Sequence, residues 1–435
     1  MNNPDSSLTT RRDFLKTSTT AALAGALSSP FALTGNAQNA PPGGTLKIGL
    51  IGCGGRGTGA AAQALKGDSH IELVAVADAF ERPIAGSLKA VAGEAGQEKV
   101  KVKPENMFVG LDAYQKVINS GVDVVLLASP PGFRPFHLRA AIEAGKHVFC
   151  EKPMATDVPG LRSVMESVRS AKEKKLALVA GFCWRYDYPK RALFQRIHEG
   201  QIGDVRTIYG TYLTGPVKPM PPASARPEGI TDLEWMVRNW YNFNWLGGDG
   251  ILEQAVHTVD WLAWAMKDEP PVSCTAVGGR QIPANGGNIF DHMEVNYVWK
   301  NGVRGFVAQR QITGCYGENH LTVIGSRGIA HIDTRGASIS GENEWRYDGE
   351  KPDMYQVEHN ELFASIRSGK PINDGDRMAK STLMGIMGRQ AAYTGQQLTW
   401  EMILNSQQVL VPEVKDWNSK VEPLPMAMPG KTQFI

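Results

Sequence analysis

Short apolar runs alternate with segments of helical spacing in the first part of the chain. Runs without polar interruption are typical of strands buried on both faces, and parallel sheets covered by helices contain such strands. We therefore predict a parallel sheet with helices on both sides. The predicted strands are 46–51, 71–77, 122–128, 147–150 and 176–180, and the predicted helices are 59–65, 136–144 and 158–174.

After residue 182 the pattern changes to segments that fit an antiparallel sheet. The Asn301-Gly302 pair is a hairpin turn signal between two of these segments. A chain of 435 residues exceeds the length at which a single core stops growing, so two domains are expected. The predicted strands are 204–213, 272–281, 294–299, 304–312 and 321–324, and the predicted helices are 249–266, 355–368 and 376–393.

The N-terminal segment has the features of an export signal. Arg11-Arg12 precede Phe14-Leu15-Lys16, and an uncharged stretch of mostly small and apolar residues covers 17–33. This order is typical of a twin-arginine signal, whose export machinery delivers folded proteins to the periplasm. A membrane anchor is the alternative, but the stretch is short and rich in Thr, Ser, Ala and Gly. We predict a signal peptide over 1–37 and a linker over 38–44, with no membrane span afterwards.

Composition and charge argue against several classes of partner. Apolar residues make up 42% of the chain and charged residues 21%, as in ordinary globular proteins. The net charge of +2 argues against binding to nucleic acid or to an anionic membrane surface. The five cysteines are scattered, and no His/Cys cluster indicates a metal site.

A glycine-rich loop joins the first predicted strand to the first helix. Gly52, Gly54 and Gly57 form a G-x-G-x-x-G pattern, and Asp78 follows the second strand about 20 residues later. In this context the pattern is a dinucleotide fingerprint, with the pyrophosphate at the helix N-terminus and the carboxylate on the adenosine ribose. A carboxylate repels a 2′-phosphate, so we predict NAD rather than NADP, although Arg82 lies nearby.

Glu151-Lys152-Pro153 follows another strand of the parallel sheet, at the edge where ligands bind in open α/β sheets. A lysine at this edge reaches both a nicotinamide ribose and a substrate hydroxyl, and its charge stabilises a forming alkoxide. A solvated loop lysine is the alternative. The order of fingerprint, strand and tripeptide favours the catalytic interpretation.

Glu253, His257 and Asp260 are spaced so that one face of the predicted helix 249–266 carries all three. An ordinary histidine pKa of about 6.5 suits a general base near neutral pH, and a carboxylate one turn away orients the ring. A structural ion pair and a metal site are the alternatives, and the metal is less favoured without a further His/Cys cluster. We predict His257 as the base and Glu253 as its orienting carboxylate.

The order of these motifs resembles the Gfo/Idh/MocA family of oxidoreductases, and the likeness runs through nearly the whole chain after the signal. The features that carry it are the glycine loop, Asp78, Ser129-Pro130, the helix with His137, Glu151-Lys152-Pro153, Trp184-Arg185-Tyr186, Gly200-Gln201-Ile202-Gly203, Gly247-Gly248, His257-Thr258-Val259-Asp260 and 388–395.

The resemblance implies a Rossmann domain with a parallel sheet over 45–182, then an α+β domain over 183–435 with a large, open, mainly antiparallel sheet. It also implies a nicotinamide cofactor, a sugar or polyol substrate, and homo-oligomers packed through the sheet faces. Lys152 matches the family's active-site lysine and His257 its acid/base histidine, whereas Glu253 stands where many relatives have Asp. The residues expected at the cofactor are Gly52, Gly54, Gly55, Arg56, Gly57, Asp78, Ser129, Pro130, His137, Glu151 and Lys152.

Half of the ten tryptophans lie within one short stretch of the second domain. Their ring faces suit stacking on sugar C–H surfaces, and core packing is the alternative, which is favoured for Trp261 and Trp264. Trp184, Arg185 and Asp260 are predicted to line the substrate pocket. The five clustered residues are Trp235, Trp240, Trp245, Trp261 and Trp264.

These features together predict an exported NAD-dependent oxidoreductase acting on a sugar, glycoside or polyol. His257 takes the hydroxyl proton, Lys152 stabilises the oxygen, and hydride passes to the cofactor. Free NAD is not expected outside the cytoplasm, so the cofactor is expected to be tightly retained. A redox-neutral NAD-dependent glycoside hydrolase and a non-catalytic sugar-binding protein are the alternatives.

Overall fold

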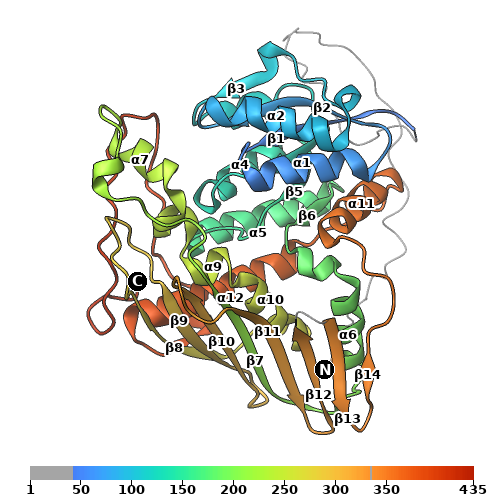
Figure 1. Cartoon of the computed structure of the whole chain (residues 1–435), viewed down its shortest axis with the longest axis vertical. Coiled ribbons are helices and arrows are strands. Elements are labelled where there is room, and N and C mark those ends of the chain that lie inside the picture. The colour runs from blue at the N-terminus through green and yellow to red at the C-terminus, as the bar shows by residue number, and fades with distance from the viewer. Residues whose placement is uncertain (1–42, 334–335) are drawn as a thin grey trace, which may run out of the picture. The chain divides into compact units, whose positions relative to one another are not determined.

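The computed structural model describes residues 43–333 and 336–435. The predicted signal peptide, and most of the predicted linker, lie outside the described residues. Within the described chain, the first domain is built on a six-stranded parallel sheet in the order β3-β2-β1-β4-β5-β6 (Figure 1). The strands are β1 (Leu46–Ile51), β2 (Ile71–Asp78), β3 (Met107–Val109), β4 (Val124–Leu127), β5 (His147–Cys150) and β6 (Leu178–Ala180).

This strand order reverses direction between β1 and β4, which is the point where open α/β sheets bind their ligands. Helices cover both faces of the sheet, as the continuous apolar strands predict. One face packs against α1 (Gly55–Gly67), α2 (Arg82–Ala95) and α11 (Met354–Arg367), and the other packs against α3 (Ala113–Ile118), α4 (Arg134–Glu143) and α5 (Val158–Glu173).

Helix α11 lies far along the chain yet belongs to the core of the first domain. Its Phe363 is fully buried in the same apolar cluster as side chains of α1, β1 and β2, and the Arg367 guanidinium pairs with Asp68 at 2.8 Å. The backbone just after α11 also bonds to β6, since the Leu178 amide donates to the Ile372 carbonyl at 2.8 Å. Helix α11 thus comes from the region predicted as a second domain over 183–435, and its apolar face completes a helical layer of the first domain.

The second sheet has nine strands in the order β14-β13-β12-β11-β7-β10-β9-β8-β15. All neighbouring strands are antiparallel except β7 and β10, which confirms the predicted fold class. The hairpin between β9 and β10 turns at Gly302, as predicted. The strands are β7 (Val205–Thr214), β8 (Ser273–Gly279), β9 (His292–Val298), β10 (Arg304–Gln311), β11 (Glu318–Gly325), β12 (Gly328–Asp333), β13 (Gly336–Gly341), β14 (Trp345–Arg346) and β15 (Leu398–Thr399).

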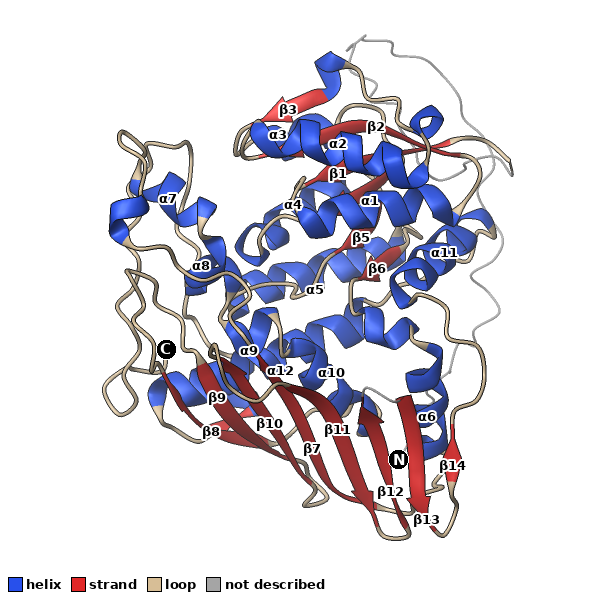
Figure 2. Ribbon diagram, viewed as in Figure 1, coloured by secondary structure: helices blue, strands red, loops and turns tan. Residues whose placement is uncertain are grey.

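Helices lie on one face of the large sheet (Figure 2). The opposite face exposes large side chains, among them Tyr209, Val277 and Ile324. No helix among the described residues combines the length and the apolar character that crossing a bilayer requires. The remaining helices are α6 (Tyr188–His198), α7 (Asp232–Arg238), α8 (Asn244–Gly247), α9 (Gly250–Glu253), α10 (Val256–Ala265), α12 (Gly375–Thr394) and α13 (Trp400–Leu404).

Candidate active site

The glycine loop between β1 and α1 needs glycine for two different reasons. A Cβ on Gly57 would lie 1.8 Å from the Gly52 carbonyl oxygen, and a Cβ on Gly52 would lie 2.7 Å from the Ala128 backbone. These two glycines therefore let the loop, the helix and β4 pack closely. A Cβ on Gly54 would meet nothing within 4 Å, and Gly54 begins α1 without a side-chain cap. The first amides of α1 are thus left for an anionic group.

A cavity of about 370 Å³ opens at the carboxyl ends of β1, β2 and β4. Asp78 lies in its wall, where the carboxylate accepts hydrogen bonds from the Cys53 amide at 2.8 Å and the Phe80 amide at 3.0 Å. Burial raises the pKa of Asp78, against the lowering effect of these amides. The predicted cofactor residues that line the cavity are Gly52, Gly54, Asp78, Ser129, Pro130 and His137. This lining fits a dinucleotide.

Ser129 and His137 face each other across the floor of this cavity, with Ser129 Oγ 2.9 Å from His137 Nδ1. The Tyr114 ring stacks on the imidazole, with ring centres 4.1 Å apart. Burial, helped by the Arg134 guanidinium, lowers the pKa of His137 to about 3, so its ring stays neutral. Arg134 itself donates to the Ser129 carbonyl at 2.6 Å and to the Pro153 carbonyl at 2.5 Å. It thereby joins the loop after β4 to the loop that holds Lys152.

Arg56 and Glu151, both predicted to contact the cofactor, contact each other instead. Arg56 Nε lies 2.5 Å from Glu151 Oε1, and the guanidinium lies over the Tyr355 ring at 4.7 Å. A second carboxylate, that of Glu358, is fully buried, and its Oε1 lies 4.0 Å from Arg56 Nη2. Neither Arg56 nor Glu151 lines the cavity. Ion pairing satisfies both side chains within the protein, and a contact of either with the cofactor stays a prediction.

Lys152, on the loop after β5, reaches across to the second domain. Its Nζ donates to the Glu253 backbone carbonyl and to Glu253 Oε1, the latter at 3.1 Å. The side chains of Lys152 and Glu253 are nearly buried, at 10% and 12% exposure. Because the carboxylate lies next to the ammonium, the buried positive charge is compensated. The second carboxylate oxygen of Glu253 accepts from Gln254 Nε2 at 2.5 Å.

The prediction that Glu253 orients the His257 ring is therefore wrong. Both of its carboxylate oxygens are bonded elsewhere, and His257 Nδ1 has no hydrogen-bond partner among the described residues. The physical reason is a break in the predicted helix 249–266, which consists of α9 and α10. Gln254, at φ −109° and ψ −61°, separates them, and its Oε1 accepts from Tyr212 Oη at 2.6 Å. Side chains four residues apart do not share a face across this break.

His257 is 8% exposed and is surrounded by aromatic rings. The Trp184 ring centre lies 4.7 Å from the imidazole, and Trp184 in turn stacks on Trp261 at 3.9 Å. Burial, together with the ammonium groups of Lys152 and Lys190, holds the pKa of His257 well below its ordinary value. The imidazole is therefore neutral, and the nearby ammonium groups disfavour its protonated form; Lys152 lies within electrostatic range.

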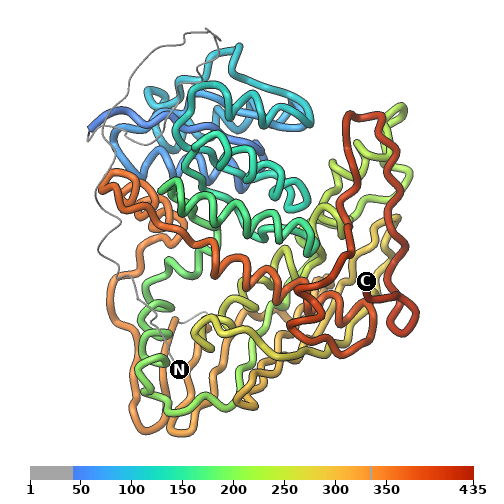
Figure 3. The backbone as a smooth tube through the Cα atoms, turned by 180° about the vertical axis from the view of Figure 1, so that it is seen from behind, coloured from blue at the N-terminus to red at the C-terminus, as the bar shows by residue number. Residues whose placement is uncertain are grey.

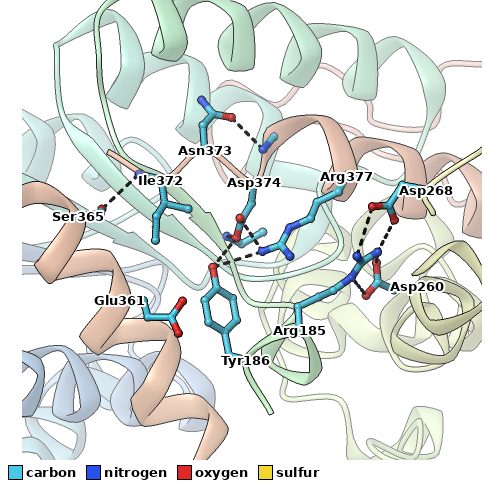
Figure 4. Close-up of polar contacts among 12 residues, drawn as sticks. Arg185, Tyr186, Asp260, Asp268, Glu361, Ser365, Ile372, Asn373, Asp374 and Arg377 are labelled. Carbon is cyan, nitrogen blue, oxygen red and sulfur yellow. Dashed lines mark hydrogen bonds and ion pairs between the residues drawn. The ribbon is translucent and has the colours of Figure 1, made fainter. Parts of the chain in front are cut away.

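Arg185 and Asp260, predicted to line the substrate pocket, form a buried ion pair (Figure 4). The guanidinium binds both Asp260 oxygens at 2.8 and 2.9 Å and also reaches Asp268 at 2.5 Å. Ser381 Oγ donates to the same Asp260 carboxylate at 2.7 Å. With side chains only 3% exposed, the pair has no surface to offer a substrate. The substrate assignment of these two residues is corrected to a structural one, because their polar atoms are already satisfied within the protein.

Two site residues had no signal in the sequence. Tyr212 lies on β7, and Gln254 interrupts what looks like a continuous helix, so neither belongs to a motif. The tertiary fold connects them as a line of hydrogen bonds from Lys152 through Glu253 and Gln254 to Tyr212. The described residues contain no group of three His, Cys, Asp or Glu side chains placed to hold a metal ion.

Family models match most of the described chain. A model described as "Oxidoreductase family, NAD-binding Rossmann fold" matches residues 46–182, and one described as "GFO/IDH/MocA C-terminal domain" matches 191–331. The chain belongs to the Gfo/Idh/MocA family of oxidoreductases. It is thus a member of an NAD(P)-dependent dehydrogenase family, as predicted.

Individual relatives are distant in sequence. An inositol 2-dehydrogenase of Rhizobium meliloti (strain 1021) is 27% identical over 299 residues, which cover 68% of this chain and 78% of that protein. A levoglucosan dehydrogenase solved with NADH and levoglucosan aligns with a TM-score of 0.64 and 19% identity, over 82% of this chain and 99% of that one. An aldose-aldose oxidoreductase from Caulobacter crescentus aligns with a TM-score of 0.63, with the same identity and coverage. The two structures show the shared fold.

Proposed function

We propose that this chain is an exported NAD-dependent oxidoreductase that oxidises a hydroxyl of a sugar, glycoside or polyol by hydride transfer. Its relatives support the substrate class, since they are named for inositol, levoglucosan and aldoses. The observation that carries the proposal is the approach of Lys152, from the end of β5, to Glu253 on the helix pair that bears the neutral His257.

The cavity lining supports a specific way of holding the cofactor. The first amides of α1 take the pyrophosphate, and Asp78 accepts hydrogen bonds from the adenosine ribose. The Asp78 carboxylate disfavours a 2′-phosphate, so NAD is proposed over NADP. When bound, NAD supplies the hydride acceptor.

Lys152 stabilises the charge that develops on the substrate oxygen. An ammonium group has three N–H donors, and two of them point to the Glu253 carbonyl and carboxylate. The third is left for the hydroxyl that is oxidised. A preorganised charged donor of this kind is worth about 10²–10³ in rate.

His257 accepts the hydroxyl proton. Its ring is neutral because burial and the nearby ammonium groups disfavour the charged form. The same repulsion from Lys152 favours passing the proton on after each turnover. The Trp184 ring contacts the imidazole at a tilt of 36°, and Trp261 stacks on Trp184 and supports it. General base catalysis contributes about 10²–10⁴-fold.

The test is to assay the purified protein for NADH formation on a panel of polyols and aldoses, with Lys152→Met and His257→Asn as variants. We expect either change to lower kcat by about 10²-fold or more. Lys172→Met is the matched control, because Lys172 pairs with Asp376 on the surface. Undiminished turnover in both variants would refute the mechanism. Release of phenol from an aryl glycoside without net NAD reduction indicates the glycoside hydrolase alternative, and no turnover at all indicates a binding protein.

Export to the periplasm is part of the same proposal. The Arg11-Arg12 pair and the stretch after it support twin-arginine export to the periplasm. We expect replacement of both arginines by lysine to leave the protein in the cytoplasmic fraction. Cell fractionation of the wild type and of this variant decides the point.

Self-association through the open face of the large sheet is also proposed. Large side chains such as Tyr209, Val277 and Ile324 are exposed on these strands, at 40%, 72% and 41%. Light scattering of the wild type and of Tyr209→Glu measures the oligomeric state. A wild-type monomer at micromolar concentration would contradict the proposal.

A further inference from the structure

The wall of the nucleotide cavity opposite the glycine loop comes from the second domain. Lys218, Val237, Arg238 and Trp240 line the same cavity as Asp78. They belong to the segment that links β7 to α8 and contains α7. The cavity is therefore not an open groove along the Rossmann sheet, since a distant part of the chain closes one side of it.

Phe80, two residues after Asp78, is the contact point for this closure. The Arg238 guanidinium lies over the Phe80 ring at 4.3 Å, and the Trp417 ring stacks on it with centres 5.3 Å apart. Arg238 is held in place by Glu234, whose Oε1 accepts from its Nε at 2.9 Å. A ring next to the ribose-binding carboxylate is thus held by a cation and by a second ring from elsewhere in the chain.

Trp417 is carried by the C-terminal segment after α13. The segment is fastened on both sides of this residue. On one side the Leu410 amide donates to Asp157 Oδ2 at 2.7 Å, and on the other Asn288 Nδ2 donates to the Leu424 carbonyl at 2.9 Å. In Figure 3 this red segment runs beside the yellow-green segment that contains α7.

Apolar packing joins the C-terminal segment, the α7 segment and the nucleotide loops. Leu410 and Val421 are buried in one cluster with Met236 of α7. Phe80 and Leu111, from the loops after β2 and β3, pack against the same cluster. The cover over the cavity is therefore part of a hydrophobic core and not a loose surface loop.

We infer that residues 216–240 and 405–425, here called the strap, hold the adenosine end of the cofactor in place, so that NAD leaves only when the strap separates from Phe80. The inference rests on the proposed function, because it requires the cavity to bind NAD. It makes NAD a resident group that is reduced and reoxidised in place. The position of Lys218 agrees with this role: it has no carboxylate partner among the described residues and faces a cavity suited to an anionic dinucleotide.

The experiment measures how fast bound NAD leaves the full-length protein. The protein is loaded with NAD and desalted, and its nucleotide content is measured by mass spectrometry. Release is then followed by exchange against excess etheno-NAD, which changes fluorescence on binding. We expect about one NAD per chain to remain on the wild type, and Trp417→Ala to release it at least about 10-fold faster. Trp417→Phe keeps a ring on Phe80 and should restore slow release.

Trp345→Ala is the matched control, because Trp345 lies on β14 at the far edge of the large sheet. If Trp417→Ala does not fold, Arg238→Ala removes the other contact with Phe80 and is expected to speed release in the same way. A wild type that binds NAD but exchanges it as fast as these variants would overturn the strap alone. If no form binds NAD at millimolar concentration, the proposed function fails, and the strap fails with it.

Discussion

Burial decides the protonation state of several side chains in this protein. His137, His257 and His359 are all buried, and in each case burial is the largest cause that lowers the pKa of the imidazole. Of these three, only His257 has Lys152 close enough to lower its pKa further, so burial alone does not single out the candidate base. What distinguishes the site is a neutral base within range of a compensated ammonium.

His359 allows the effect of burial to be measured apart from catalysis. Its two ring nitrogens have no hydrogen-bond partner among the described residues, and burial lowers its pKa to about 3. Below pH 6.5 the unfolded chain binds a proton on this histidine, whose unfolded pKa is about 6.5, whereas the folded chain does not. The contribution of neutral His359 to the free energy of unfolding is therefore full above pH 6.5 and is lost as the pH falls from there toward 3.

We expect His359→Phe, which keeps the stacking on Phe149, to remove this dependence. Between pH 7 and pH 5 the wild type should lose about 2 kcal/mol more free energy of unfolding than the variant. Urea unfolding at both pH values measures the difference. An equal loss in both proteins would show that His359 is not held neutral.

Tyr212 tests the line of hydrogen bonds that positions Lys152. It does not touch Lys152, and it acts through Gln254 and Glu253. Tyr212→Phe removes one hydrogen bond of this line, so we expect kcat to fall about 3- to 10-fold with little change in KM. Steady-state kinetics separate the two constants, and a purely structural role would instead lower the melting temperature with kcat unchanged. Tyr316→Phe is the control, because Tyr316 is 71% exposed and lies outside this line of hydrogen bonds.

The strand–loop–helix unit of β1 and α1 shows how an element depends on close backbone approach. Gly57→Ala places a Cβ 1.8 Å from the Gly52 carbonyl, where backbone and not a flexible side chain has to move. We expect the free energy of unfolding to fall by about 1–3 kcal/mol and NAD retention to fall with it. Gly93→Ala in α2 meets nothing within 4 Å, so the same substitution should stabilise by about 0.5–1 kcal/mol. Thermal unfolding of both variants checks the opposite signs.

The helix pair α9 and α10 shows that a break in an element can carry function. Regular spacing would place Glu253 one turn from His257. The turn at Gln254 instead directs the Glu253 carboxylate to Lys152. The Gln254 side chain donates a hydrogen bond to Glu253 and accepts one from Tyr212. The break thus links the sheet of the second domain to Lys152 of the first.

At the level of the whole molecule, buried ion pairs join segments that are distant in sequence. Arg185 with Asp260 connects the end of the first domain to α10, and Arg377 with Asp374 at 2.5 Å lies next to it (Figure 4). Such pairs add little net stability when intact, but removing one partner leaves a buried charge uncompensated.

We expect Asp260→Asn to lower the free energy of unfolding by about 3 kcal/mol, because it leaves the buried Arg185 with a weaker partner. Asp268→Asn should cost about 1 kcal/mol or less, since the Asp268 side chain is 29% exposed and solvent screens its charge. Denaturant midpoints at constant slope measure both losses. Equal losses would contradict a dominant role for the buried pair.

Local features of the sequence were sufficient to predict the fold class and the cofactor loop. Apolar runs predicted five of the six strands of the first domain and missed the short β3. The glycine spacing with Asp78 predicted the cavity, because both signals depend on residues close together in the chain. Lys152 and His257 were chosen as candidates in the same way, each by its place after a strand or a glycine-rich turn, and their catalytic roles stay predictions. The structure differed from the predictions where the backbone leaves regular helix geometry, as at Gln254.

Contacts between distant segments were decided only by the tertiary structure. Lys152 and Glu253 are 101 residues apart, and no spacing rule reveals that the carboxylate serves the lysine and not the histidine. The pairing of Arg185 with Asp260, the return of α11 to the first domain and the strap on Phe80 are contacts of the same kind. The residues expected of a site come from local pattern, whereas their partners depend on which surfaces meet when apolar faces are buried together.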